Sequence, residues 1–140
     1  MAESQQGRAA RLELELQRDG PTCAWCAREF GSHVVPTTDH LVPRVKGGPS
    51  RLENEVAACR RCNRERGHRS PVDWLEECGR RGWTPDAGRV LRVLTSLEEV
   101  VAVHGGHRRA RPYLDNQLRR LRKHDQVSDF QDVHETGPNG

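Results

Sequence analysis

The sequence predicts an α+β fold, in which two strands and one helix form a small unit between an N-terminal helix and a helical C-terminal half. Two Cys-x-x-Cys pairs, at positions 23–26 and 59–62, enclose two runs of strand character. Helical periodicity dominates from residue 70 onward. Hydrophobic residues make up only 34% of the 140 residues, so we expect something besides apolar burial to hold the fold together.

The first element, residues 8–18, fits two readings. Its leucines alternate as in a strand, but Ala9, Leu12 and Leu16 also fit one helical stripe. The surrounding residues are good helix formers, and Asp19-Gly20-Pro21 is a stop signal. We therefore predict a helix here.

The next elements form a hairpin. Residues 37–42 and 52–58 are predicted strands joined through Lys46-Gly47-Gly48-Pro49, and a helix is predicted to start near Cys59. Asp39 and His40 are adjacent, and neighbours in a regular strand point to opposite faces. We therefore expect the first strand to end or bulge at this pair, as the following Pro43 allows.

The C-terminal half carries repeated helix-start signals. Ser70-Pro71-Val72-Asp73 places serine at the N-cap and proline at the first helical position, and Thr84-Pro85-Asp86 repeats that signal. A last helix is predicted over about 112–123, and residues 125–140 lack periodicity and are predicted to be disordered. The apolar stripe of the middle helix consists of Val90, Val93, Leu94, Leu97, Val100 and Val101.

The paired cysteines indicate a metal site. The first twenty residues lack the apolar core of a signal peptide and no run approaches a membrane span, so we expect a cytoplasmic protein with reduced thiols. Two Cys-x-x-Cys pairs then favour a tetrahedral structural zinc over four unrelated buried cysteines. The expected zinc ligands are Cys23, Cys26, Cys59 and Cys62, and Cys78 is expected in the core.

Positive charge is concentrated in two stretches. Residues 44–69 contain eight Arg or Lys against three Glu, and residues 107–124 contain seven against one Asp. This pattern fits a polyanionic partner such as nucleic acid, but it equally fits solvated helix faces. Charge alone does not decide between them.

Four cysteine ligands leave zinc no open position, so we expect the chemistry to lie in the segment between the pairs. Asp39 offers a hard oxygen ligand, and His40 is a base that titrates near neutral pH. Asn63 directly follows the last zinc cysteine, so the zinc would hold it beside the hairpin. Asp39 and Asn63 could then bind a divalent cation that keeps several water ligands, as magnesium prefers.

The set of motifs "CAWC", "DHLVPRVKGG", "LENE" and "CRRCN", over about residues 20–69, resembles the HNH endonuclease family. The resemblance implies the ββα-metal fold, also called the His-Me finger, here held together by zinc. It implies that Asp39 binds the catalytic metal, that His40 is the general base, and that Asn54 orients the imidazole by a hydrogen bond across the hairpin. Asn63 stands where the family often has histidine, which is similar to the HNN variants and implies a second oxygen ligand for magnesium or manganese.

The resemblance further implies a metal-dependent DNA endonuclease that leaves a 5′-phosphate and a 3′-hydroxyl. We expect double-stranded DNA as substrate, with no membrane partner and no small-molecule cofactor, and the sequence leaves the oligomeric state open. The expected organisation is an N-terminal helix and lead-in (1–22), the nuclease core (23–69), a helical extension (70–124) and the tail (125–140).

Two other functions remain compatible with the sequence. A zinc-stabilised nucleic-acid-binding module without catalysis would need the cysteines and arginines, but not Asp39, His40 and Asn63 together. A helical interaction protein would use residues 71–123 and leave the first half without a role.

Overall fold

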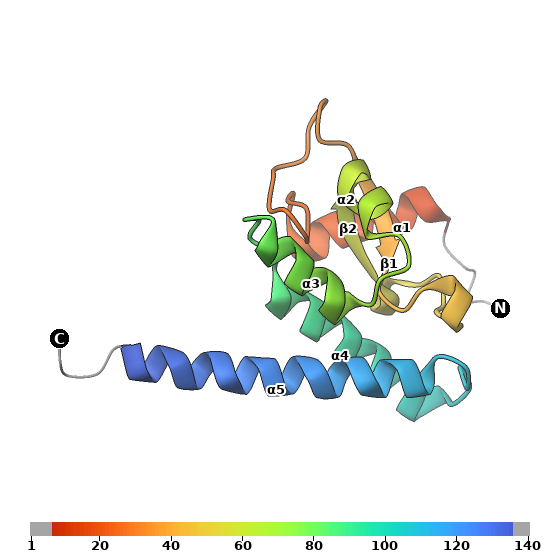
Figure 1. The fold of residues 1–140 in the computed structure, drawn as a ribbon. Helices are drawn as coiled ribbons and strands as arrows, with labels where there is room; N and C mark the ends of the chain where they lie inside the picture. Colours follow the sequence, from red (N-terminus) through yellow and green to blue (C-terminus); the bar gives the residue numbers. More distant parts are fainter. Residues whose placement is uncertain (1–6, 136–140) are drawn as a thin grey trace.

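The computed structural model describes the backbone of residues 7–135 and the side chains of residues 7–123. Figure 1 shows a two-stranded hairpin with helices around it and a long last helix across the base of the molecule. No helix in the described part of the chain is long and apolar enough to cross a membrane. The elements are α1 (Arg8–Asp19), β1 (Pro36–His40), the 3₁₀ turns η1 (Arg44–Lys46) and η2 (Leu52–Asn54), β2 (Glu55–Cys59), α2 (Arg60–Arg66), α3 (Pro71–Arg80), α4 (Ala87–His104) and α5 (Arg111–Glu135).

The antiparallel hairpin confirms where the first strand ends. β1 pairs with β2 from Pro36 opposite Cys59 to His40 opposite Glu55, and β1 ends at His40. The Asp39-His40 pair therefore lies where the ladder of hydrogen bonds stops. The second predicted strand begins three residues later than expected, because residues 52–54 form the turn η2.

The two glycines between the strands are required by close packing. Gly47 has φ +89°, in the left-handed region that favours glycine, and a Cβ there would lie 2.8 Å from the Cβ of Arg109. A Cβ at Gly48 would lie 1.7 Å from the backbone oxygen of Val42. Only glycine fits these two positions, so the Gly-Gly pair allows the loop to fold back against its own start.

The predicted helix starts are confirmed in two cases and corrected in one. α1 forms as expected, and α3 begins with Pro71 after Ser70, whose Oγ accepts a hydrogen bond from the Asp73 backbone N–H at 3.2 Å. α4 does not begin after Thr84. Its N-cap is Asp86, whose backbone N–H donates to the Ala24 carbonyl at 2.8 Å, and this tertiary contact keeps Asp86 outside the helix.

The end of the chain also differs from the prediction. The backbone of α5 continues to Glu135, whereas the sequence predicted disorder from residue 125. Once a helix has nucleated, each added residue costs little free energy, and residues 113–135 contain neither glycine nor proline. The remaining residues of the predicted tail, 136–140, lie outside the described residues.

One hydrophobic cluster connects the hairpin to the helical half. It contains residues of the first cysteine loop, of both sides of the hairpin and of α3, α4 and α5. The predicted stripe of α4 faces this core, except that Val100 is only half-buried. The predicted inward leucines of α5, Leu114, Leu118 and Leu121, are buried as well. The helical extension is therefore a continuous part of the same core and supports the hairpin.

Candidate active site and metal centre

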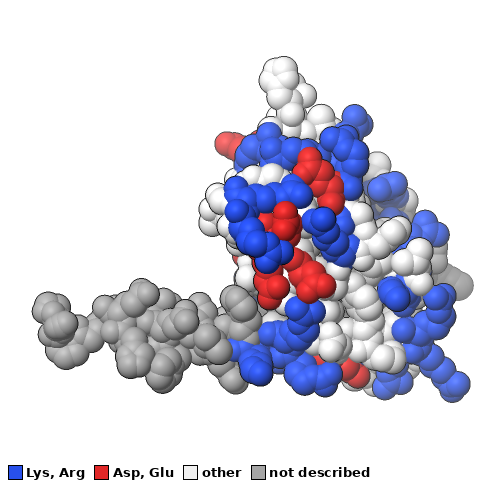
Figure 2. Space-filling view, in the orientation of Figure 1, with Lys and Arg blue, Asp and Glu red and all other residues white. Residues whose placement is uncertain are grey.

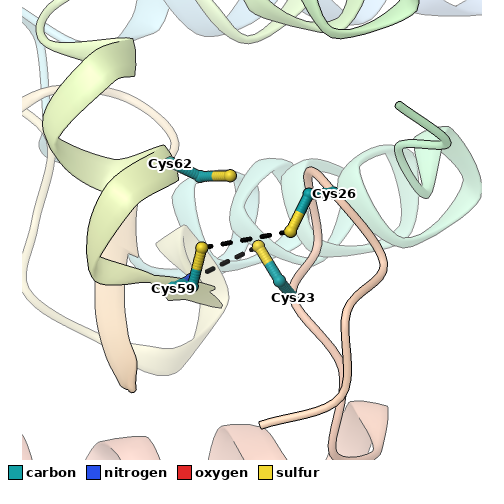
Figure 3. Close-up of side chains that lie close together, drawn as sticks. All are labelled: Cys23, Cys26, Cys59 and Cys62. Atoms are coloured by element: carbon teal, nitrogen blue, oxygen red, sulfur yellow. Dashed lines mark hydrogen bonds between the residues drawn. The ribbon is translucent and has the colours of Figure 1, made fainter. Parts of the chain in front are cut away.

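The four cysteines predicted to bind zinc come together. Their sulfur atoms all lie within 4.8 Å of one another, and Cys26 Sγ is 3.9 Å from Cys59 Sγ. Figure 3 shows the side chains converging from the first cysteine loop, the end of β2 and the first turn of α2. Zinc–sulfur bonds of about 2.3 Å give a tetrahedron with edges of about 3.8 Å. The cluster therefore fits a zinc ion with four thiolate ligands.

Hydrogen bonds to these sulfurs favour the thiolate form. The Cys59 backbone N–H donates to Cys23 Sγ at 3.2 Å, and the Arg28 guanidinium donates to Cys26 Sγ and Cys59 Sγ at 3.3 and 3.4 Å. The hydrogen bond from the Cys62 thiol, together with the backbone donors, lowers the pKa of Cys23 to about 4. Arg28 supplies positive charge beside a site whose four thiolates outweigh the charge of one Zn²⁺ ion.

The first cysteine loop also contacts Asp39, the residue predicted to bind the catalytic metal. Trp25, between Cys23 and Cys26, donates its indole N–H to Asp39 Oδ2 at 2.8 Å. Both Trp25 and Asp39 are buried, with 0% and 5% of their surfaces exposed. The metal centre therefore positions Asp39 through a side chain that lies inside the cysteine loop.

Arg66 binds the other oxygen of Asp39. It donates to Asp39 Oδ1 at 2.8 Å and to the backbone oxygens of His40, Leu41 and Arg69 at 2.7–3.0 Å, and it is 1% exposed. Burial raises the pKa of Asp39, and the guanidinium opposes that rise. Arg66 therefore ties α2 to the end of β1 and balances the Asp39 carboxylate, a structural role that the sequence did not distinguish from phosphate contact.

Asn63 is held against the first strand and lines the same pocket as Asp39 and His40. Its side-chain N–H group donates to Thr37 Oγ1 at 2.9 Å and to the Thr38 backbone oxygen at 3.2 Å, which fixes the amide against β1. The amide oxygen is then the acceptor left for a ligand. Asp39, His40 and Asn63 all line one pocket of about 310 Å³. The structure therefore brings together the three residues that the sequence assigned to metal binding and proton abstraction.

His40 is held in its neutral form. Burial lowers the pKa of its imidazole, and the guanidinium groups of Arg44 and Arg11 act in the same direction, against Glu55 and Asp39. A neutral imidazole can accept a proton at neutral pH, as a general base must.

Asn54 does not have the partners that the sequence predicted. Its side chain accepts from the Val42 backbone N–H at 2.9 Å and donates to the carbonyls of Val42 and Pro49, both at 3.0 Å. It is fully buried, so its amide satisfies backbone groups that the loop would otherwise leave unpaired. Asn54 therefore holds the loop that follows His40, and the predicted hydrogen bond to the imidazole is wrong.

A buried pair of acids lies behind the site. Glu15 of α1 and Glu55 of β2 are both 0% exposed, and their side chains share a hydrogen bond. Burial, together with the neighbouring Glu55, raises the pKa of Glu15 to about 9. Glu55 Oε1 accepts from Arg11 Nε at 2.9 Å, and Thr38 donates its hydroxyl to Glu15 at 3.3 Å. At neutral pH Glu15 therefore keeps its proton, which lies in the hydrogen bond between the two side chains.

This pair leads to a stability prediction. Unfolded Glu15 loses its proton near pH 4.5, whereas folded Glu15 keeps it to about pH 9. The folded state then binds one proton more, so between these values the free energy of unfolding falls with rising pH, by at most about 1.4 kcal/mol per pH unit from this group. Glu15→Gln cannot ionise but still donates an N–H to Glu55. We expect this variant to lose that slope and to be more stable than wild type at pH 8.

Urea unfolding between pH 5 and pH 9 measures this difference. The matched control is Glu13→Gln, which changes an exposed acid on the same helix and should keep the wild-type slope. Identical slopes for Glu15→Gln and wild type would show that Glu15 is ionised in the folded protein.

Several residues of the site were missed by sequence reasoning. Arg66 lies one helical turn after Asn63, a spacing that places both on one face of α2 and was the available signal. Glu15 and Glu55 carried no signal, because nothing local marks either as buried. His68 lines the same pocket as Asp39 and His40, although sequence reasoning assigned no role to it.

Comparisons with known proteins bear on the same segment. Residues 23–74 match the HNH endonuclease family. A CRISPR-associated endonuclease Cas9 from Actinomyces naeslundii is 39% identical over 75 residues, which are 52% of this chain and 6% of that protein. The Cas9 from Corynebacterium diphtheriae is 34% identical over 79 residues, or 51% of this chain and 7% of that protein. The matched segments therefore span less than a tenth of the length of these relatives.

A solved structure is also similar. The crystal structure of the Type II-C Cas9 enzyme from Actinomyces naeslundii aligns with 81% of this chain and 12% of its own, with a TM-score of 0.43 and 25% sequence identity. The family match covers both cysteine pairs and the pocket residues Asp39, His40 and Asn63. Residues 23–74 of this protein are therefore similar to the HNH endonuclease family.

Proposed function

We propose that this protein is a metal-dependent DNA endonuclease that uses His40 as its general base. The observation that carries the proposal is the convergence of Asp39, His40 and Asn63 on one pocket, beside a cysteine cluster that fits a structural zinc. The match to the HNH endonuclease family supports a nuclease role in general. The bond cleaved and the products are those that the resemblance to this family implies, and the oxygen ligands favour magnesium or manganese as the metal.

The proposed reaction is hydrolysis of a phosphodiester bond. The oxygen of a water molecule bonds to phosphorus while His40 takes its proton, a contribution of about 10²–10⁴-fold. The bond between phosphorus and the 3′ oxygen breaks, and that oxygen takes a proton from solvent. The products are a 5′-phosphate and a 3′-hydroxyl.

The proposed cofactor is a single divalent ion in this pocket. Asp39 provides a carboxylate oxygen and Asn63 an amide oxygen, which are the hard ligands that magnesium and manganese accept. Such an ion would neutralise charge on the phosphate and on the leaving oxygen. Because only two protein ligands are proposed, water and phosphate would complete its coordination.

Unpaired basic residues indicate the path of the DNA. Arg8 of α1 and Arg44 of η1 line the pocket. Figure 2 shows Lys and Arg gathered along the right-hand edge of the molecule, where η1 and the start of α5 lie in Figure 1. Over α2 and α3 basic and acidic side chains alternate, as in the pairs of Arg81 with Glu65 and Glu77. We therefore propose that phosphates follow the η1 edge, since its cations have fewer acidic partners.

A cleavage assay on defined substrates tests the proposal. Supercoiled plasmid, linear and branched duplexes and RNA are incubated with magnesium, with manganese or with a chelator, and the product ends are identified by ligation and phosphatase treatment. We expect metal-dependent cleavage of DNA with ligatable 5′-phosphate ends. Tight DNA binding without cleavage under any metal would instead support the alternative, a non-catalytic zinc-stabilised nucleic-acid-binding module.

A further inference from the structure

The register of the hairpin places an acid directly opposite the proposed general base. His40, the last residue of β1, pairs with Glu55, the first residue of β2. His40 Nε2 is 2.9 Å from Ser50 Oγ and 3.4 Å from Glu55 Oε2. The Glu55 side chain is 0% exposed, so its carboxylate meets the imidazole out of contact with solvent.

α1 holds the Glu55 carboxylate in place. Arg11 Nε lies 2.9 and 3.1 Å from the two carboxylate oxygens, and Glu15 shares a hydrogen bond with the same group. Arg18 donates to the backbone oxygens of Glu55 and Leu52 at 2.8 and 2.9 Å, which fixes the start of β2. All three residues of α1 precede the segment 23–74 that matches the nuclease family.

We propose that Glu55 is the positioning residue of His40 and that α1 is a built-in part of the active site. This inference rests on the proposed function. The Glu55 carboxylate, 3.4 Å from Nε2, attracts the proton to that nitrogen, so the neutral ring carries its free lone pair on Nδ1. Nδ1 is then the atom that takes the proton of the attacking water. The same carboxylate stabilises the imidazolium that forms, as the acid does in a Ser-His-Asp triad.

Ser50 cannot select this tautomer alone. A hydroxyl can donate to a bare nitrogen or accept from a protonated one, so it fits either form of the ring. The Glu55 carboxylate, which pairs with Arg11 through both oxygens, only accepts hydrogen bonds. The Glu55 carboxylate therefore decides which nitrogen of the His40 ring carries the proton. The Ser50 hydroxyl then acts as the matching donor or acceptor.

Nitrogen-15 NMR of the histidine rings in the full chain tests this inference directly. We expect the His40 ring of the wild type to carry its proton on Nε2, with a downfield N–H signal that exchanges slowly with water. In Glu55→Gln the introduced amide has one oxygen, which Arg11 binds, so its NH₂ group faces Nε2. We therefore expect the ring to shift toward the Nδ1–H form and kcat for DNA cleavage to fall roughly tenfold to hundredfold, with KM unchanged.

Glu53→Gln is the matched control. It makes the same chemical change two residues away, at an acid whose partner is Arg51, and should leave the tautomer and kcat as in wild type. An Nδ1–H tautomer in the wild type would overturn the inference whether or not Glu55→Gln folds. A shift caused by Ser50→Ala but not by Glu55→Gln would also overturn it.

The two proposals fail in different ways. The NMR measurement needs no substrate, so it reports on Glu55 even if the wild-type protein cleaves nothing. Absence of cleavage with the Nε2–H tautomer present would refute the proposed function and leave the positioning of His40 by Glu55 intact.

Discussion

His40→Ala should lose nearly all DNA cleavage while keeping its fold and its zinc. Removing the base costs about 10²–10⁴-fold in rate. The backbone oxygen of His40, which accepts from Arg66 at 2.8 Å, is retained by alanine, and Glu55 keeps its ion pair with Arg11 at 2.9 Å. The truncation therefore removes a proton acceptor without leaving a buried charge unpaired. Single-turnover cleavage, thermal unfolding and elemental analysis of zinc measure the three properties.

His33→Ala is the control for this prediction. His33 is exposed and lies in the connection that leads to β1, away from the pocket residues, so its loss should change none of the three properties. If His40→Ala cleaves as fast as wild type, the base lies elsewhere. If it unfolds or loses zinc, His40 has a structural role.

Asp39 is a poorer target for separating catalysis from folding. It accepts from Trp25 and from Arg66, both at 2.8 Å, and Arg66 is 1% exposed. Removing one partner of a buried ion pair costs about 3–5 kcal/mol, because the other charge is left uncompensated. Loss of activity in Asp39→Ala would therefore combine a lost metal ligand with a loosened hairpin.

Cys59→Ser should lose zinc and much of the stability of the folded state. Cys59 ends β2 and is the N-cap of α2, and its sulfur is one of the four clustered ligands. Structural zinc contributes roughly 10–16 kcal/mol of apparent binding free energy in small zinc domains, and that energy is also folding energy. We expect less than one zinc per chain, a large drop in the unfolding temperature and loss of cleavage, because Trp25 no longer holds Asp39.

Cys78→Ser provides the matched control. Cys78 is equally buried, but it lies on α3 outside the metal cluster. We expect it to keep one zinc per chain and to lose only the smaller free energy of placing a hydroxyl in the core. Full zinc content and wild-type stability in Cys59→Ser would show that the cluster does not hold a structural metal.

The sequence by itself determined the features that depend on short spacings. Each Cys-x-x-Cys pair indicates half of a metal site from four residues alone. The start of α3 at Ser70-Pro71 is likewise predicted from the residues of its first turn. The end of β1 at His40 follows from the two adjacent polar side chains, which a regular ladder cannot point to one face. These constraints act within a few residues, so they can be predicted without knowledge of the fold.

Only the tertiary structure decided how the active-site side chains are partnered. Arg66 and Asp39 are 27 residues apart, Trp25 and Asp39 are 14 apart, and Glu55 is 44 residues from Arg11. For each of these polar or charged side chains, the surrounding sequence is as compatible with exposure to solvent as with burial. Packing removes these groups from water, and a buried polar group must then find a partner among whatever the fold brings near. For the same reason the side chain of Asn54 forms hydrogen bonds with the backbone of the loop. His40 likewise lies beside the buried carboxylate of Glu55.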